Sequence, residues 1–295
     1  DIDAVPFFLA EIMASNIGGT ATLIGDPPNI MIGSAAGYSF VDFVVYDTPA
    51  ALLSLAVMLA LFYLLFGRKL HVDDAHKDAL AGLDEREQIK NPILLRQSVV
   101  MIVLVVVGFM AHGSLGIESC VVALTAAGVL MLISGERIEE ALAHVEWTTL
   151  VFFAGLFIIV GALSEVGVIG MLAQALIDVT GGSTFVAMLV LLFASAIISS
   201  FLDNIPFVAT MIPILLSMEA TGMDVAPLWW AVSLGACLGG NGTLIGASAN
   251  VVMSDISRKN GHVITFAHFF KVGFPTMLAT VAVSAIYLIV RFPPM

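Results

Sequence analysis

The feature that most limits what this chain can fold into is a series of long apolar segments. Five of them approach the roughly 20 residues that cross a bilayer as a helix: 49–66, 94–111, 117–134, 148–163 and 274–290. Only 12% of the residues are charged and 59% are hydrophobic, against about 25% and 45–50% in soluble domains. The alternating hydrophobicity of a membrane β-barrel is absent. We therefore expect an all-α polytopic membrane protein.

Charge placement predicts how the chain is threaded through the bilayer. Six of the eleven Lys and Arg residues lie between positions 68 and 96, among many acidic residues. Because Lys and Arg collect in cytoplasmic loops, we expect the loop of residues 67–93 to be cytoplasmic. Counting spans onward returns Arg137, Arg258 and Lys259 to the same side and leaves the C-terminus outside. Residues 136–146 are typical of a short amphipathic helix at that interface.

Composition argues against several other properties. The net charge is −12 and the chain has no basic patch, so nucleic acid is not an expected partner. Cys120 and Cys237 both fall in apolar segments, where we expect them to pack rather than to form a disulfide. No signal peptide pattern is visible. The chain begins at Asp1 without an initiator Met, so we expect an N-terminal portion to be missing.

Other apolar segments are interrupted by glycine and polar residues. Residues 6–17 and 227–238 are too short to cross a bilayer, and each continues into a glycine-rich stretch, 18–29 and 239–250. Residues 184–200 and 206–218 flank the sequence Phe201-Leu-Asp-Asn-Ile205, and we expect them to form a re-entrant helical hairpin. Irregular backbone at membrane depth is tolerated only where protein buries it or water reaches it. These breaks therefore mark the candidate site.

The two interrupted segments are copies of each other. At one offset of 221 residues, Gly18-Gly19 matches Gly239-Gly240, Thr22-Leu23-Ile24-Gly25 matches Thr243-Leu244-Ile245-Gly246, and Asn29 matches Asn250. After a small insertion, Phe40 matches Phe266 and Pro49 matches Pro275. Hydrophobicity alone would repeat Leu and Val rather than Gly, Thr, Pro and Asn. The matches therefore indicate an internal repeat.

The repeat is predicted to be inverted. The span 49–66 ends in the cytoplasmic loop and so runs inward, whereas its counterpart 274–290 starts near Lys271 and runs outward. Inverted repeats with sites at the bilayer midplane are typical of secondary transporters. We expect residues 1–66 to be the C-terminal part of repeat one, whose hairpin was lost with the missing N-terminal portion. Residues 94–295 then form repeat two, with the hairpin at 184–218, a broken helix at 227–257 and the last span at 274–290.

Asp203-Asn204, between two apolar half-helices, is the sharpest candidate for chemistry. A carboxylate inside a membrane is costly unless it is paired, hydrated or bound to a cation, so a functional role is the default interpretation. The alternative is that Asn204 only caps the helix opened by Pro206, with Asp203 reaching the same amides. That helix also directs a positive dipole end at the midplane, which suits an anionic substrate. Ser199 lies one turn away and could add an oxygen.

The two glycine-rich loops are expected to supply the other half of the site. Their glycines let carbonyls turn inward, and Thr and Asn add neutral oxygens of the kind that hard cations prefer. Purely structural kinks capped by Asn29 and Asn250 are the alternative. Asp26 occurs only in the first loop, where Ala247 replaces it in the second. The candidate ion- and substrate-binding residues are Asp203, Asn204, Ser199, Thr22, Gly25, Asp26, Asn29, Asn241, Thr243, Gly246 and Asn250, with Asp203, Asn204, Thr243 and Gly246 as a Na⁺ set.

The stretches 16–29, 201–210 and 238–250 resemble the P-protein (pink-eyed dilution) permeases of the ArsB/NhaD group. These belong to the ion transporter superfamily, with the divalent anion:sodium symporters and citrate transporter-like domains. The resemblance covers essentially the whole chain. It implies an inverted-repeat fold with two re-entrant hairpins, often homodimeric. Sodium-coupled carboxylate relatives carry Ser-Asn-Thr at the hairpin tip, where this chain reads Asp203-Asn204-Ile205. Asn204 therefore matches the Asn of that triplet, whereas an aspartate at the position of Asp203 resembles the sequence of the NhaD antiporters.

We therefore expect a secondary permease, coupled to Na⁺ or H⁺, for a small inorganic or organic anion, without a cofactor. The runner-up is a Na⁺/H⁺ antiporter in which Asp203 binds both ions. An intramembrane aspartyl protease is a remote alternative, because Tyr46-Asp47 and Gly25-Asp26 resemble its motifs. We reject it, because position 23 is Leu, the order of the motifs is reversed and Asp47 lies at a segment end. Hydrolase motifs are absent, so the chain is not expected to be an enzyme. A passive channel fits paired broken helices less well than alternating access does.

Overall fold

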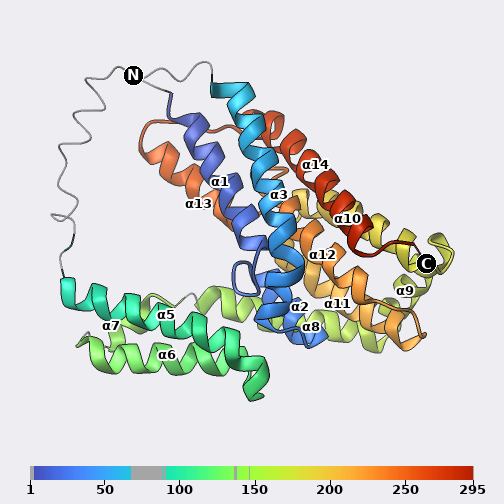
Figure 1. The fold of residues 1–295 in the computed structure, drawn as a ribbon, viewed down its shortest axis with the longest axis horizontal. Helices are drawn as coiled ribbons and strands as arrows, with labels where there is room; N and C mark the ends of the chain where they lie inside the picture. Colours follow the sequence, from blue (N-terminus) through green and yellow to red (C-terminus); the bar gives the residue numbers. More distant parts are fainter. Residues whose placement is uncertain (1–2, 68–88, 90, 136–137, 146, 295) are drawn as a thin grey trace. The chain divides into compact units, whose positions relative to one another are not determined.

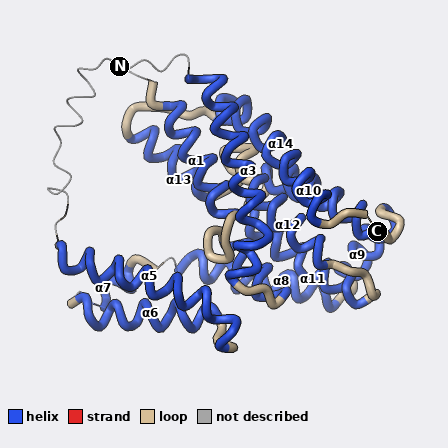
Figure 2. The backbone as a smooth tube through the Cα atoms, viewed as in Figure 1, coloured by secondary structure: helices blue, strands red, loops and turns tan. Residues whose placement is uncertain are grey.

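The computed structural model describes residues 3–67, 89, 91–135, 138–145 and 147–294. Within these residues the chain consists of helices, turns and loops without any strand (Figure 2). Five of the described helices are long and apolar enough to cross a membrane. They are α3 (Phe40–Phe66), α5 (Pro92–Leu115), α8 (Trp147–Glu165), α10 (Thr184–Phe201) and α14 (Phe266–Arg291). The expected all-α polytopic membrane architecture is confirmed.

The bounds of several spans differ from those predicted. The last span was expected at 274–290, but α14 already begins at Phe266, and α3 likewise begins at Phe40 rather than Pro49. Proline in a helix removes one hydrogen bond and usually ends or bends the helix. Here Phe43 and Phe269, which precede the two prolines, are fully buried. Their packing holds the extra turns in place, so both prolines lie inside helices. The expected span at 117–134 is the 16-residue helix α6 (Ser119–Ser134).

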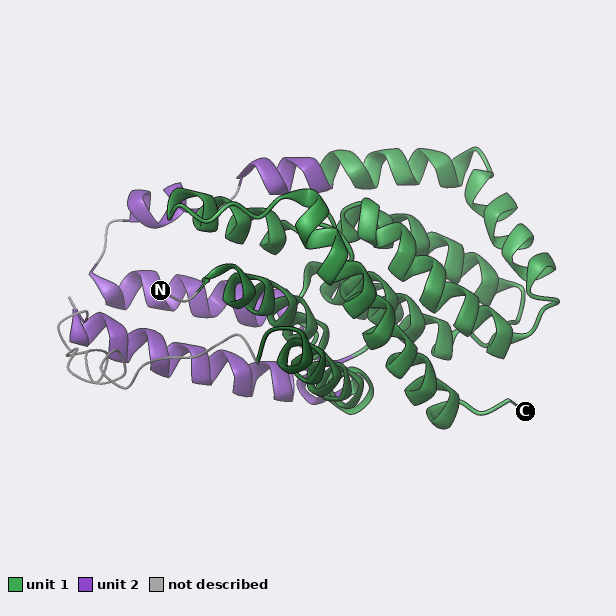
Figure 3. Cartoon of the chain, turned by 90° about the horizontal axis from the view of Figure 1, so that it is seen from above, with its two compact units in different colours: residues 1–38, 42–70, 154–295 green, residues 39–41, 71–153 purple. Residues whose placement is uncertain are grey.

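The chain divides into two compact units (Figure 3). The second unit comprises Ser39–Val41 and His71–Phe153, and its described helices include α5 and α6. These two helices pack together through a turn at Gly116, whose positive φ of 64° suits glycine. The short helix α7 (Ile138–Ala143) lies in the segment predicted to be interfacial. The predicted cytoplasmic loop falls almost entirely outside the described residues.

The first unit holds both interrupted segments, each as two helices joined by a loop. In the first segment α1 (Val5–Thr20) and α2 (Pro27–Ala36) flank loop 1, residues 21–26. In the second, α12 (Ala226–Gly239) and α13 (Ser248–Lys259) flank loop 2, residues 240–247. The helices α3 and α14, which follow them, run in opposite directions (Figure 1) and meet where the Ser54 hydroxyl lies 3.4 Å from the Thr280 carbonyl oxygen.

Between these segments the chain turns back on itself. Helix α10 ends at Phe201 and α11 (Asn204–Ala220) begins after Leu202 and Asp203. At the other end, the Thr184 hydroxyl that opens α10 donates to the Asp224 carbonyl just beyond α11, at 3.1 Å. The two helices therefore form a hairpin whose tip is residues 200–204. Helix α9 (Val168–Val179) packs beside α11.

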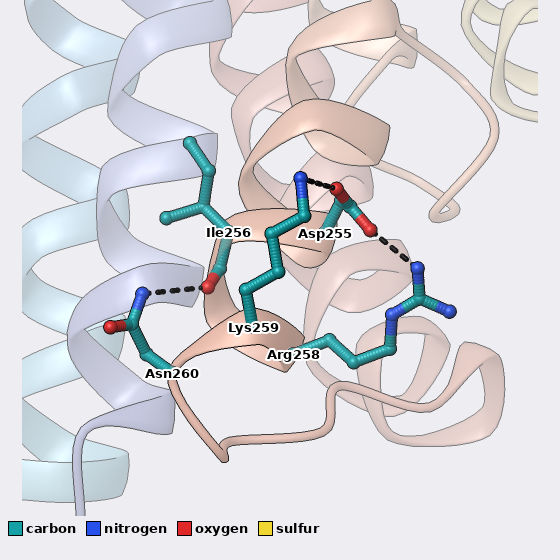
Figure 4. Close-up of polar contacts among 5 residues, drawn as sticks. All are labelled: Asp255, Ile256, Arg258, Lys259 and Asn260. Atoms are coloured by element: carbon teal, nitrogen blue, oxygen red, sulfur yellow. Dashed lines mark hydrogen bonds and ion pairs between the residues drawn. The ribbon is translucent and has the colours of Figure 1, made fainter.

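The C-terminal turn of α13 is charged and exposed. Asp255 pairs with Arg258 at 2.5 Å and with Lys259 at 2.7 Å, and the Asn260 amide donates to the Ile256 carbonyl (Figure 4). Hydrogen bonds from Lys259 and Arg258 hold the pKa of Asp255 below its ordinary value. Its negative charge is therefore retained at neutral pH. The side of the membrane that this turn faces stays a prediction.

Candidate functional site

Loop 1 and loop 2 have the same internal hydrogen bonds, each closed by an asparagine. Asn29 Nδ2 donates to the Gly19 and Thr22 carbonyls at 3.4 and 3.0 Å. Asn250 Nδ2 donates to the equivalent Gly240 and Thr243 carbonyls at 2.7 and 2.8 Å. Both asparagines are fully buried. Their amides therefore hold the loop carbonyls in place and are themselves occupied.

Close approach of glycines makes this closure possible. A Cβ added at Gly19 would lie 2.9 Å from the Gly25 carbonyl oxygen, and one added at Gly246 would lie 2.8 Å from that of Gly240. Both distances are shorter than side-chain contacts normally allow. Any larger residue would force the two ends of the loop apart, which explains why the same glycines occur in both copies.

Contacts between the two copies are reciprocal: a residue of each copy reaches the loop asparagine of the other. Asn16 of α1 donates to Asn250 Oδ1 at 2.8 Å, and Cys237, the residue equivalent to Asn16 in α12, lies 3.4 Å from Asn29 Oδ1. Asn16 also donates to Asn241 Oδ1 at 2.9 Å. Such reciprocal contacts are expected for a pseudo-two-fold axis between the copies. How that axis lies relative to a membrane stays a prediction.

The hairpin tip reaches both loops. Asp203 Oδ1 accepts from the Ile205 amide at 3.0 Å and so caps α11. Asn204 Nδ2 instead donates to both carboxylate oxygens of Asp26 in loop 1, at 3.1 and 3.2 Å. On the other side of the tip, the Thr243 hydroxyl of loop 2 donates to the Ser200 carbonyl.

The remaining predicted residues are placed as follows. The Ser199 hydroxyl donates to the Ala236 carbonyl at 2.7 Å and so joins α10 to α12. Gly246 packs against the Ser200 backbone, because a Cβ added at Gly246 would lie 3.1 Å from the Ser200 carbonyl oxygen. Asn241 is buried against α1, whereas Thr22 is half-buried and Gly25 is exposed. Loop 2 is thus covered by the hairpin, and the equivalent part of loop 1 is open in this chain.

A small pocket of about 130 Å³ lies where these elements meet. Its wall is formed by three helix N-termini and by α1, and its lining residues are Ser15, Asn16, Gly19, Gly25, Asp26, Pro27, Asn204, Ile205, Ala247, Ser248 and Ala249. The first residues of α2, α11 and α13 all contribute. Each N-terminus carries roughly +0.5 of an elementary charge. These partial charges act against two carboxylates: Asp26, the one carboxylate in the lining, and Asp203, which caps α11.

Several residues of this region were not predicted from the sequence to belong to the site. Asn16 lines the pocket and bridges the two copies, yet its only signal was its place at the start of the loop 1 motif. Ser233 and Asp47 are buried beside Asn29 and 2.6 Å from each other. Ser233 lies within an apolar helix and no pattern marks it, whereas Asp47 was noted only as part of the Tyr46-Asp47 pair of the rejected protease motif.

Broken helices whose N-termini meet at one pocket inside a polytopic helical protein are the arrangement of a membrane transporter. The family model described as citrate transporter (CitMHS) matches residues 1–235. The chain therefore belongs to the citrate transporter family, which is a family of transporters and not of enzymes.

Curated relatives agree with this assignment. The chain is 44% identical over 294 residues to a 46 kDa membrane protein of Mycobacterium leprae, covering 99% of this chain and 68% of the relative. It is 45% identical over 296 residues to an uncharacterized transporter of Mycobacterium tuberculosis, with the same coverage. It is also 31% identical over 370 residues to the human P protein, covering 98% of this chain and 44% of that protein. The resemblance to P-protein permeases is thus confirmed.

Proposed function

We propose that this protein is a secondary transporter that moves a small organic anion of the citrate class together with a cation. The convergence of three helix N-termini on one pocket carries this proposal. The positive dipole ends of these helices favour a carboxylate without a fixed positive charge. Backbone N–H groups are fewer, because α2 begins with Pro27 and Pro28, and in α11 the Ile205 amide is bonded to Asp203. The start of α13 therefore offers the N–H groups for the anion. The family description favours a carboxylate over an inorganic anion.

Asp26 supplies the coupling. A carboxylate beside the pocket repels an anion unless its charge is neutralised, and at membrane depth that repulsion is only weakly screened. A Na⁺ ion or a proton on Asp26 removes the repulsion. Anion binding and cation binding then favour each other, as cotransport requires.

The contacts in the structure lead us to assign the predicted residues different roles from those expected. Asp203 caps α11 and does not line the pocket, so we assign the coupling charge to Asp26 and its partner Asn204. Asn29 and Asn250 act as positioning residues. The Na⁺ set of Asp203, Asn204, Thr243 and Gly246 remains a proposal for a second cation at the hairpin tip.

A Na⁺/H⁺ antiporter is the second candidate. A single pocket carboxylate with no basic residue in the pocket lining can alternately bind a proton and a Na⁺ ion. In that case the three N-termini would serve only to moderate the affinity of Asp26 for cations.

Uptake by purified protein in proteoliposomes separates the two candidates. We expect radiolabelled citrate to accumulate when an inward proton or Na⁺ gradient is imposed, and Asp26→Asn to lose this dependence. Proton flux driven by a Na⁺ gradient in the absence of any organic anion would instead establish the antiporter. Neither flux, from protein that is monodisperse in detergent, would refute both.

A further inference from the structure

A second buried carboxylate lies outside the pocket. Asp47, in the N-terminal third of α3, is fully buried, and its Oδ2 lies 2.6 Å from the Ser233 hydroxyl of α12. Its Oδ1 has no hydrogen-bond partner among the described residues. A buried ionised carboxylate normally accepts several hydrogen bonds or pairs with a cation. Asp47 has one such contact, which is the environment of a neutral acid.

Counting protons along this contact leads to the same conclusion. Ser233 Oγ lies 2.6 Å from Asp47 Oδ2 and also 2.8 Å from Asn29 Oδ1. The Asn29 amide nitrogen donates to backbone carbonyls, so its oxygen can only accept. Two short O···O contacts need two protons, and the serine hydroxyl supplies one. A second proton on Asp47 would satisfy both contacts: Asp47 would donate to Ser233 while Ser233 donates to Asn29.

No cation offsets a charge at this position. The described residues place no Lys, Arg or His within ion-pair distance of Asp47; the Arg291 guanidinium of α14 lies over the Tyr46 ring, 4.7 Å from its centre. The other titratable groups that interact with Asp47 are Tyr287 of α14 and Cys237 of α12. Neither carries a positive charge. Ionisation of Asp47 would therefore be uncompensated by its surroundings.

This contact is continuous with the pocket. Beyond Ser233 and Asn29, the Cys237 thiol lies 3.4 Å from Asn29 Oδ1 and interacts with the Asp26 carboxylate. Asp26 is in turn bonded to Asn204 at the hairpin tip. An unbroken series of side chains therefore joins Asp47 to the proposed anion site.

The second copy shows that loop closure does not need a carboxylate. There the positions equivalent to Asp47 and Ser233 are Gly273 and Ile12. Loop 2 nevertheless keeps the same internal bonds, with the uncharged amide of Asn16 donating to Asn250 Oδ1. Asp47 is thus a titratable group found in one copy only. The donor to Asn250 Oδ1 in the other copy, Asn16, stands at the position equivalent to Cys237.

We propose that Asp47 is a proton-binding residue of this transporter, and that Ser233 transmits its protonation state to Asn29 and hence to loop 1. When the proton leaves Asp47 for solution, the Ser233 hydrogen turns to the new carboxylate. Asn29 Oδ1 then loses that donor and faces a lone pair of Ser233. The hydrogen bonds that hold loop 1 closed are then weaker, and Asp26 and Asn204 are held less firmly in their positions. The inference deepens the proposed function by naming a coupling proton, but its first tests need no transport.

Infrared spectroscopy tests the protonation directly. We expect the detergent-solubilised protein at neutral pH to show a C=O stretching band of a protonated carboxylic acid that is absent from Asp47→Asn. Asp42→Asn, on the same helix, is the matched control and should leave the band unchanged. In Ser233→Ala the band should shift, because the acid loses its acceptor. A spectrum unchanged in both Asp47→Asn and Ser233→Ala would overturn the proposal.

Amide hydrogen exchange tests the transmission. We expect Ser233→Ala to speed exchange in residues 18–29 by on the order of fivefold, the effect of one lost hydrogen bond. Residues 239–250 are the internal control and should not change. Asp47→Asn should leave loop 1 at the wild-type rate, because its amide donates to Ser233 as the acid does. Ser195→Ala, at a buried serine outside this series, controls for the substitution itself. Equal effects on both loops would overturn the transmission.

Transport then separates the two proposals. If the spectroscopic results hold but no anion moves with a proton gradient, the proposed function fails and the proton site stands. If citrate uptake in Asp47→Asn keeps the full pH dependence of the wild type, Asp47 does not carry a coupling proton.

Discussion

At the scale of single residues, Asp26 decides whether the pocket holds an anion alone or an anion with a cation. We expect Asp26→Asn to keep the bond to Asn204 while removing the charge, so that cation-driven citrate uptake falls by about tenfold or more. The measurement is the initial rate of uptake in proteoliposomes with and without the imposed gradient.

Asp203→Asn is the matched comparison for this prediction. Asparagine caps helices as well as aspartate does, so the cap on the Ile205 amide should survive. Uptake should then stay within about twofold of the wild type. The opposite ranking of the two variants would return the coupling charge to Asp203.

At the scale of elements, the close approach of glycines in loop 1 predicts a sharp difference between neighbouring positions. A Cβ at Gly25 would collide with the Gly19 backbone, whereas one at Gly18 would meet nothing within 4 Å. We expect Gly25→Ala to destabilise the protein by about 1–3 kcal/mol. Gly18→Ala, on an exposed turn of α1, should be neutral or slightly stabilising. Thermal unfolding in detergent measures both.

The equivalence of the two loops predicts that their asparagines are equally important. Asn29→Ala and Asn250→Ala each leave buried carbonyls unpaired, so we expect each to lower the free energy of unfolding by about 1–3 kcal/mol. Asn260→Ala removes a similar bond at the exposed end of α13 and should change stability by no more than about 0.5 kcal/mol. A large effect in only one loop would contradict their structural equivalence.

At the scale of the whole molecule, the charge distribution predicts that the end of α13 is cytoplasmic and that the C-terminus is external. In a Cys120→Ala background, where the remaining Cys237 is buried, we expect Lys259→Cys to react with a membrane-impermeant maleimide only in inside-out vesicles. Pro294→Cys should react only in intact cells. Labelling of both from the same side would show that α14 does not cross the membrane.

The helical membrane architecture and the two broken segments were predictable because hydrophobicity, glycine and proline act locally. The matches around Gly25 and Gly246 likewise lie in short stretches of sequence. The start of α14 has a local signal, because the Thr265 hydroxyl caps the helix by accepting from the His268 amide. It was missed because Lys271 and Pro275 interrupt the apolar run that follows.

What the sequence by itself determined is the class of protein, the repeat and the segments in which the site lies. Only the tertiary structure decided which side chains in those segments meet. Asn204 reaches Asp26 across 178 residues, and Ser233 reaches Asp47 across 186. No local pattern records such a pairing, because a lone Ser or Asp in an apolar helix has the same neighbours in sequence whatever it contacts. The roles of these carboxylates follow from their partners, and folding alone selects the partners.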